Sequence, residues 1–181
     1  TGSVFVYDAE QNRWAHVGRL GEEKEVMGVA VYNGKLYAGT LPLGQVFRFD
    51  GPGNWALTGR LDTTADVTYR RVWSMAVYDG KLFAGTLPSG HVYSLEAGEN
   101  VSYDRPLPSD WAHLAAVKEG GVLRLYVDGV CVAETDAFDP DEFDLDNLKS
   151  LLIGFSERDY FSGRMLDVRL YGRALGGAKV H

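Results

Sequence analysis

A block of twenty residues occurs twice in this chain of 181 residues. It reads "VYNGKLYAGTLPLGQVFRFD" at residues 31–50 and "VYDGKLFAGTLPSGHVYSLE" at residues 77–96. The pattern G-x-V-[FY] within it also opens the chain, so that Gly2, Gly44 and Gly90 start equivalent runs 42 and then 46 residues apart. A repeat of this length, built from short runs, is typical of proteins that assemble one small sheet per repeat.

Alternation of apolar and polar residues runs through the sequence, as in "GSVFVYD" and "GQVFRFD". This period of two predicts β-strands, and helical periodicity is nearly absent. Asn33-Gly34, Asp79-Gly80 and Asp128-Gly129 each separate two apolar runs, a pattern typical of two-residue hairpin turns. We therefore expect an all-β protein with three tight hairpins, in which residues 27–40 form two inner strands and residues 44–61 form two outer strands.

The composition excludes several classes of partner. With 45% hydrophobic residues the chain can bury a core, and its formal net charge of −7 disfavours nucleic acid and anionic membranes as partners. No stretch is long and apolar enough to span a membrane. The single Cys131 stands in the alternating run "LYVDGVCVAE", which predicts a small buried side chain and no internal disulfide.

The units "YNGKLYAGTLPLGQVFRFD" and "YDGKLFAGTLPSGHVYSLE" resemble blades of kelch-like bacterial β-propellers. The resemblance covers about residues 1–98 and implies two four-stranded blades plus a fraction of a third. Propeller blades usually number four to eight, so the set is incomplete for a closed ring.

A different pattern follows the second block. The stretches "WAHLAAVKEGGVLRLYVDGVCVAE" and "LLIGFSERDYFSGRMLDVRLYGRAL" resemble the C-terminal half of laminin-G-like, concanavalin-A-like jelly rolls, over about residues 103–178. We expect propeller blades at residues 1–98 and an antiparallel jelly-roll or β-sandwich segment at residues 99–181, with five or six strands after Trp111.

Both parts are incomplete relative to the families they resemble, and three explanations are open. The chain is the C-terminal piece of a longer protein, or it assembles with copies of itself, or the blades replace missing jelly-roll strands. We favour the first explanation because Thr1 lies directly against a blade motif.

The longest difference between the two repeats is the segment "DTTADVTYRR" before the second hairpin. Blade connectivity places it near the propeller axis, where Tyr69, Arg70, Arg71 and Trp73 gather beside Thr86. Arginine forks and aromatic faces suit anionic or sugar ligands, so these five residues form the candidate ligand site. The alternative is that the arginines pair with acidic neighbours and Trp73 packs within its blade.

An acidic stretch, "ETDAFDPDEFDLDN" at residues 134–147, is a candidate calcium site. Calcium prefers clustered oxygen ligands, and some laminin-G-like domains bind it; the candidate ligands are Asp139, Asp141 and Asp144. The spacing differs from an EF-hand, and a solvated connection between strands is the simpler interpretation. No cofactor is otherwise expected.

We find no convincing catalytic constellation in the sequence. The four histidines are scattered, there is no nucleotide-binding glycine motif, and no carboxylate pair stands out for glycoside hydrolysis. We therefore expect a secreted or surface-associated bacterial module that binds carbohydrate or protein. The alternatives are an accessory part of an extracellular glycan-active enzyme and a structural assembly protein.

Overall fold

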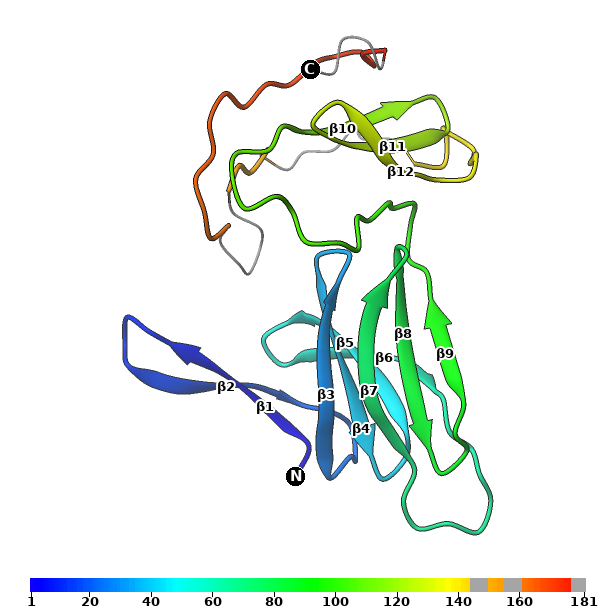
Figure 1. Ribbon diagram of the computed structural model, residues 1–181. Helices are drawn as coiled ribbons and strands as arrows, with labels where there is room; N and C mark the ends of the chain where they lie inside the picture. The colour runs from blue at the N-terminus through cyan, green and yellow to red at the C-terminus, as the bar shows by residue number, and fades with distance from the viewer. Residues whose placement is uncertain (144–149, 155–160, 177–181) are drawn as a thin grey trace. The chain divides into compact units, whose positions relative to one another are not determined.

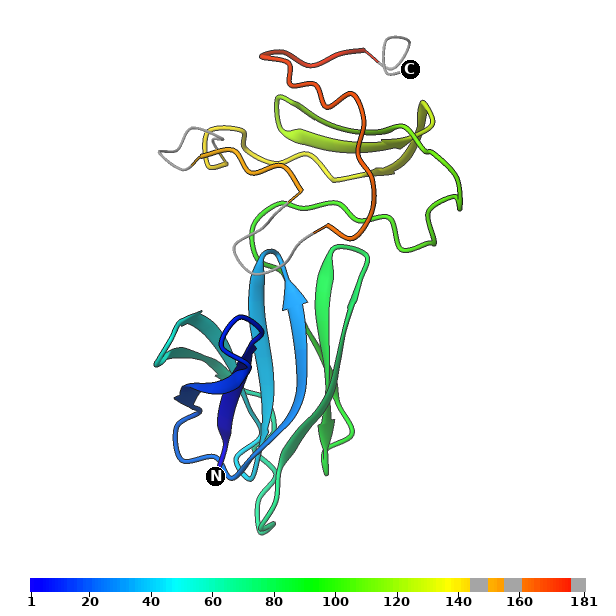
Figure 2. The same cartoon turned by 90° about the vertical axis from the view of Figure 1, so that its left-hand side faces the viewer.

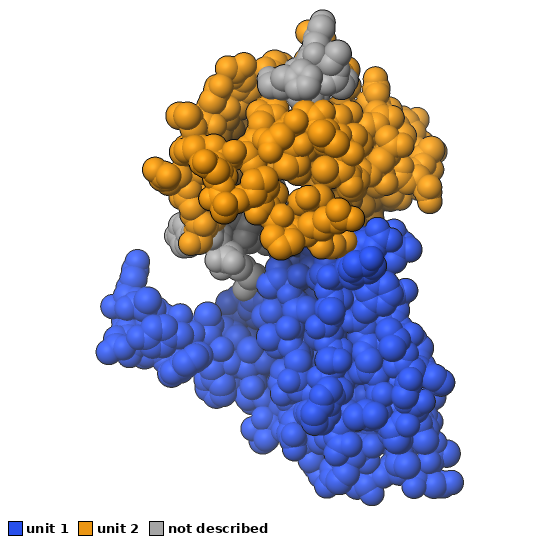
Figure 3. Space-filling model, in the orientation of Figure 1, with its two compact units in different colours: residues 1–96 blue, residues 97–181 orange. Residues whose placement is uncertain are grey.

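The computed structural model describes residues 1–143, 150–154 and 161–176. It divides into two compact units, residues 1–96 and residues 97–181, coloured separately in Figure 3. The described residues contain strands and turns but no helix, and thus no apolar helix that could span a membrane. All pairs of strands are antiparallel, and none of the four sheets closes into a barrel in the part of the chain that is described.

The first unit consists of three small sheets, and within each sheet the paired strands are consecutive along the chain (Figure 1). The middle sheet has the order β3-β4-β5-β6, which confirms the two inner strands expected in residues 27–40 and the two outer strands expected in residues 44–61. The bounds are β1 (Ser3–Asp8), β2 (Arg13–Arg19), β3 (Glu25–Tyr32), β4 (Lys35–Leu41), β5 (Gln45–Gly51), β6 (Asn54–Arg60), β7 (Arg71–Tyr78), β8 (Lys81–Leu87) and β9 (Val92–Leu95).

All three expected hairpin turns are present. Both turn residues have positive φ in each of them, 45° and 69° at Asn33-Gly34, 47° and 68° at Asp79-Gly80, and 48° and 76° at Asp128-Gly129. The flanking residues pair directly, as Tyr32 does with Lys35. The repeated "[ND]-G-K-L" sequence is therefore a turn that sets strand register, as type I′ turns do.

The sheets of the first unit stack through small residues. A Cβ atom added at Gly39 in β4 would lie 2.7 Å from both Val72 Cγ1 and Val72 O in β7. Val72 is fully buried by this approach, and the Tyr32 hydroxyl donates to Gly80 O at 2.8 Å across the same two sheets. Because Gly39 has no side chain, the backbone of β4 in the second sheet can contact the Val72 side chain of the third sheet.

The first sheet covers the other face of β4 and β5. Leu20, which follows β2, is fully buried with Ala38 and Phe47, and Val4, Val26 and Trp55 pack around them. The Trp55 indole donates to Val17 O at 3.1 Å, so β2 and β6 are also joined by a polar contact. Within the first unit, the described residues do not close a ring of blades.

The second unit holds one three-stranded sheet, β10 (Leu114–Glu119), β11 (Val122–Val127) and β12 (Val130–Glu134), in chain order. The expectation of five or six strands after Trp111 is wrong for the described residues, because 150–154 and 161–176 contain no strand. Residues 161–176 run as an open trace in Figure 2. Their alternating Leu166 and Leu170 are 78% and 81% exposed, since alternation creates a strand only where another strand supplies the hydrogen bonds.

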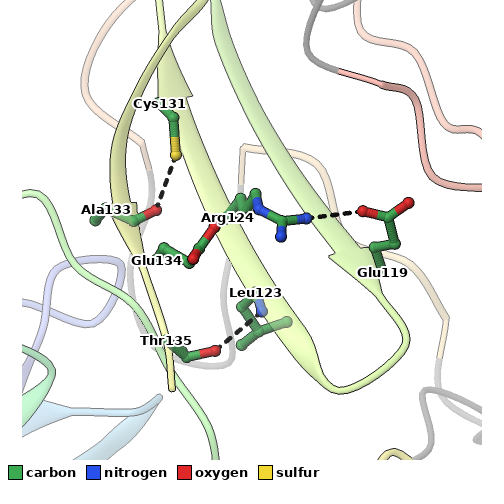
Figure 4. Close-up of polar contacts among 7 residues, drawn as sticks. All are labelled: Glu119, Leu123, Arg124, Cys131, Ala133, Glu134 and Thr135. Carbon is green, nitrogen blue, oxygen red and sulfur yellow. Dashed lines mark hydrogen bonds and ion pairs between the residues drawn. The ribbon is translucent and has the colours of Figure 1, made fainter. Parts of the chain in front are cut away.

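Cys131 is exposed, which corrects the expectation of a buried side chain. The register between β11 and β12 shifts at this point, because Tyr126 pairs with Cys131 but Leu125 pairs with Ala133. Such a bulge interrupts the alternation of faces on which the expectation depended. The thiol lies 3.6 Å from Ala133 O (Figure 4).

Arg124 in the middle strand of this sheet joins its two neighbours by ion pairs. Its Nη1 lies 2.8 Å from Glu119 Oε2 at the end of β10, and its Nε donates to Glu134 in β12, as Figure 4 shows. On the next strand position Leu123 N donates to Thr135 Oγ1 at 3.0 Å. These contacts fix the pairing of β11 with β12 at the C-terminal end of β12.

The close approach at Gly39 predicts the cost of adding one methyl group there. Gly39→Ala forces Val72 to move and is expected to lower the free energy of unfolding by about 1–3 kcal/mol, as overpacking does. Gly59→Ala in β6 is the matched control, because its nearest neighbour is 3.7 Å away. Urea denaturation of both variants measures the difference, and equal stabilities would contradict the stacking described for β4 and β7.

Candidate functional site

Residues 61–70 connect the second sheet to the third and are built around a buried carboxylate. Asp62 has no exposed surface. Its Oδ1 accepts hydrogen bonds from Thr64 N at 3.0 Å and Thr64 Oγ1 at 2.7 Å, and its Oδ2 accepts one from Ser89 N at 3.1 Å. Both oxygens are thus satisfied, one within the loop and one by the turn that follows β8.

The environment of Asp62 favours its ionised form. Burial raises the pKa of a carboxyl group, but here the hydrogen bonds from Thr64 and Ser89 together outweigh burial and hold the pKa of Asp62 well below its usual range. The loop is therefore stabilised by a charge that is present throughout the neutral pH range.

The same contact occurs one repeat earlier. Glu23 is fully buried, and its Oε2 accepts a hydrogen bond from Leu43 N at 3.1 Å, where Leu43 and Ser89 occupy the same place in "TLP-x-G". Glu23 and Asp62, the inter-repeat carboxylates, both follow a "GRL" sequence at the end of an outer strand. They differ in one respect, because Glu23 Oε1 is buried without a hydrogen-bond partner.

Sequence reasoning missed the inter-repeat carboxylates. The recurring "GRL" was visible, but the acid lies one residue after it in one copy and three residues after it in the other. An alignment that allows this insertion would have singled out both acids.

Arg70 fixes the far end of the loop. Its backbone N donates to Pro42 O at 2.9 Å, and its Nε donates to Thr64 O at 2.7 Å. A single parallel bridge pairs it with Leu43. Its side chain is thus committed to the loop itself, and not to an acidic neighbour as the alternative interpretation held.

Tyr69 and Trp73 are the exposed residues of the candidate site, and Arg71 is partly buried. Tyr69 is 46% and Trp73 54% exposed, while the Arg71 guanidinium lies 5.9 Å from the centroid of the Tyr69 ring. Trp73 falls at a register shift, because Val72 pairs with Thr86 and Ser74 pairs with Gly85. The first repeat has the same bulge with Met27 in this position, so the bulge is common to both repeats and the tryptophan is not.

Thr86 lies within the repeat scaffold. It is 4% exposed, and its Oγ1 contacts Ser89 Oγ at 2.7 Å and donates to His91 O at 3.0 Å. Thr40 makes the equivalent bond to Gln45 O in the first repeat. The structure therefore brings Arg71 against Tyr69, leaves Trp73 exposed on β7, and keeps the Thr86 hydroxyl in the turn.

The candidate calcium ligands are only partly covered by the structure. Asp139 Oδ1 accepts a hydrogen bond from Asp141 N at 3.0 Å, which makes a local turn, while Asp144 lies outside the described residues. Among the described residues no group of three His, Cys, Asp or Glu side chains could hold a metal ion.

The second unit contains a pair that sequence reasoning did not single out. The Arg164 guanidinium lies 5.2 Å from the centroid of the Trp111 ring, and Trp111 is 54% exposed. The two residues are far apart in the sequence and are neither repeated nor part of a motif, so no sequence signal indicated the contact. It is a second arrangement of arginine over an exposed aromatic ring.

Comparison with known proteins finds a matching family model and similar solved structures. The family model described as the concanavalin A-like lectin/glucanases superfamily matches residues 73–181, which begins within β7 and so includes part of the second repeat. A crystal structure of an S-layer domain-containing protein (residues 221–444) from Clostridium thermocellum ATCC 27405 aligns with 99% of this chain and 97% of that chain, at 16% identity and a TM-score of 0.29. No curated protein matches the chain.

Replacing the loop carboxylate tests its contribution. Asp62→Asn removes the charge and is expected to lower the free energy of unfolding at pH 7 by about 1–3 kcal/mol, the cost of a buried polar partner lost. Because the folded-state pKa is lowered, this stabilisation is complete above about pH 4 and is lost as the pH falls further. The difference between wild type and variant should therefore shrink below pH 4, as measured by denaturant unfolding at several pH values.

Asp66→Asn is the control for this experiment, because Asp66 lies in the same loop with an exposed side chain. Its stability should stay within about 0.5 kcal/mol of wild type. Equal effects of the two substitutions at neutral pH would show that Asp62 has no special role.

Proposed function

The chain belongs to the concanavalin A-like lectin/glucanases superfamily, and from this membership we propose that it is an extracellular, non-catalytic recognition module that binds carbohydrate. The observation that carries the proposal is the exposed surface of Tyr69, Arg71 and Trp73, here called the aromatic loop surface. Tyr69 lies on a loop whose two ends are fixed by hydrogen bonds, and Arg71 and Trp73 lie in the first residues of β7, which follows that loop.

The chemistry of the aromatic loop surface suits a sugar. The apolar face of a sugar ring packs on an exposed aromatic ring, and Tyr and Trp supply a large contact area with few rotatable bonds. Arg71 adds a planar set of N–H donors that matches hydroxyl and carboxylate oxygens. Because Asp62 and Arg70 already order the loop, binding loses little further conformational entropy.

Neutral and acidic sugars place different demands on this surface. Both use the two rings, but only an acidic sugar gains a charged hydrogen bond from Arg71. Around a chain whose formal net charge is −7, that local cation would select for uronic or sialic acid groups against the general repulsion. We expect acidic glycans to bind more tightly than their neutral counterparts.

The finer architecture is part of the same proposal. We infer that residues 1–98 are propeller blades and residues 99–181 a jelly-roll segment. The four-stranded order β3-β4-β5-β6 supports a blade, since propeller blades are four-stranded sheets. The membership of residues 73–181 in a jelly-roll family supports the second part, although the matched region starts before residue 99.

Calcium binding by the acidic stretch of residues 134–147 is a separate part of the proposal. Asp139 and Asp141 supply exposed carboxylates, and further acids follow in the same stretch. If calcium orders this segment, glycan binding by the second unit would depend on it, while binding by the aromatic loop surface would not.

A glycan array probed with the full chain, in calcium and in chelator, tests the proposal. We expect binding in both conditions, with acidic glycans preferred, and a loss of about ten-fold or more in affinity on Tyr69→Ala or Trp73→Ala, equal to about 1.4 kcal/mol or more. Trp14→Ala is the matched control, because Trp14 is 68% exposed in β2 and outside the surface.

Silence across neutral and acidic glycans would contradict carbohydrate recognition and favour a protein ligand. Binding that survives both substitutions but disappears in chelator would move the site to the second unit.

A further inference from the structure

Strand β1 is a sheet edge whose backbone groups are only half used. It pairs with β2, and no described residue pairs with its other edge. The strand in the same place of the next repeat, β5, is flanked on both sides, by β4 and by β6. Figure 1 shows the two-stranded sheet beside the four-stranded one.

The hairpins β1–β2 and β5–β6 share their pairing over the first part of each hairpin, and β5–β6 has a second register shift between Phe49 and Gly51. Val4 pairs with Gly18 as Val46 pairs with Gly59, and Tyr7 pairs with Trp14 as Phe49 pairs with Trp55. The register shifts after Val4 in one hairpin and after Val46 in the other. The β1–β2 hairpin is therefore the outer half of a sheet of which β3–β6 is the complete example.

The chain shows twice which strand lies against this edge. Gly39, Ala38 and Tyr37 of β4 pair with Val46, Phe47 and Arg48 of β5. Gly85, Ala84 and Phe83 of β8 pair with Val92, Tyr93 and Ser94 of β9 in the same order. In both cases the neighbour is the second strand of a hairpin with the sequence "Y-[ND]-G-K-L-[YF]-A-G-T-L-P".

Side chains on β1 are exposed where their counterparts are buried. Phe47 and Phe49 of β5 are 5% and 3% exposed, but Phe5 and Tyr7 of β1 are 52% and 47% exposed. The amino-acid types are alike, so the difference does not come from the sequence of the strand. Phe47 is covered by Ala38 of the paired strand β4 and by Leu20 of the sheet stacked on it.

The adjoining face of β3 is uncovered as well. Tyr32 points toward the third sheet, where its hydroxyl bonds Gly80 O, and Val29 and Val31 lie on the opposite face because side chains alternate along a strand. They are 56% and 68% exposed. In the next repeat the position of Val29 is taken by Met75, which is partly buried with β3 packed against β7.

We propose that the free edge of β1, together with the exposed face of β3, is the binding site for one further β-hairpin with the chemistry of residues 25–41. Its second strand pairs antiparallel with β1 and sets glycine opposite Val4, alanine opposite Phe5 and an aromatic residue opposite Val6. Its first strand covers Val29 and Val31. The occupant completes a four-stranded sheet like β3–β6.

A folded second copy of this chain has no such strand to offer. β4 lies between β3 and β5, and β8 lies between β7 and β9, so both have paired edges in every copy. The aromatic loop surface takes no part in the proposed site, and the proposal is independent of carbohydrate binding.

The test is complementation of the full chain by a peptide that copies residues 24–43. Amide hydrogen exchange followed by NMR is expected to slow by about ten-fold or more at the β1 amides that point away from β2, because exchange then requires the peptide to leave. The effect should saturate with peptide concentration. Amides of β9 are the internal control. β9 already pairs with β8, its equivalent of β4, and its other edge corresponds to the edge of β5 that pairs with β6, so a peptide that copies β3 and β4 should not protect it.

Two variants of the chain sharpen the test. Phe5→Glu or Tyr7→Glu places a carboxylate under the incoming strand and should abolish the protection, while Val130→Glu makes the same change on an exposed strand residue of the second unit and should leave it intact. NMR spectra without peptide verify that each variant is folded.

Three results would overturn the proposal. These are no slowing at any peptide concentration, equal slowing by a scrambled peptide or at β9, and protection of β1 that rises with the concentration of the chain alone. The last would assign the edge to pairing between copies of the chain.

Discussion

The buried inter-repeat carboxylates hold the small sheets of the first unit together. A two-stranded sheet such as β1–β2 is marginal by itself, and the small sheets of this unit pack on one another. Glu23 and Asp62 leave the end of one outer strand and accept an N–H group from the "TLP-x-G" turn of the following sheet. Stacking through Gly39 and Val72, and the position of the loop that precedes β7, depend on that turn being fixed.

The same local sequence has different surroundings at its successive positions in the chain. The side chains of β5 are buried because β4 and the neighbouring sheets cover them, whereas those of β1 are exposed. Burial in a repeat is therefore a property of neighbours and not of the strand alone. The aromatic loop surface illustrates the converse, because it arises where the second repeat departs from the first.

Local rules predicted the first unit well. The Asn-Gly and Asp-Gly turns, the antiparallel strands and the order within the repeat follow from residues close in sequence. Asp62 could not be recognised in this way, because its partner Ser89 is 27 residues away and its counterpart Glu23 is displaced by an insertion. Thr86 was assigned to a surface, but its hydroxyl bonds within its own turn.

The second unit shows where pattern reasoning stops. Alternation in "MLDVRLY" indicates a strand, yet pairing depends on a partner that the sequence of the segment does not specify. At Cys131 one bulge reverses the expected face. Family membership adds what local patterns lack, because it rests on the order of many positions over residues 73–181.

The four tryptophans of the chain allow a direct test of recognition by the aromatic loop surface. Trp73 lies on that surface, and Trp14 lies on β2. The Trp55 indole donates to Val17 O, and the Trp111 ring contacts the Arg164 guanidinium in the second unit. We would titrate the full chain with soluble neutral and acidic oligosaccharides and follow the four indole N–H resonances by NMR. If the aromatic loop surface binds the sugar, the Trp73 resonance shifts and saturates while the other three stay in place. A shift confined to Trp111, or no shift at all, would contradict recognition at this surface.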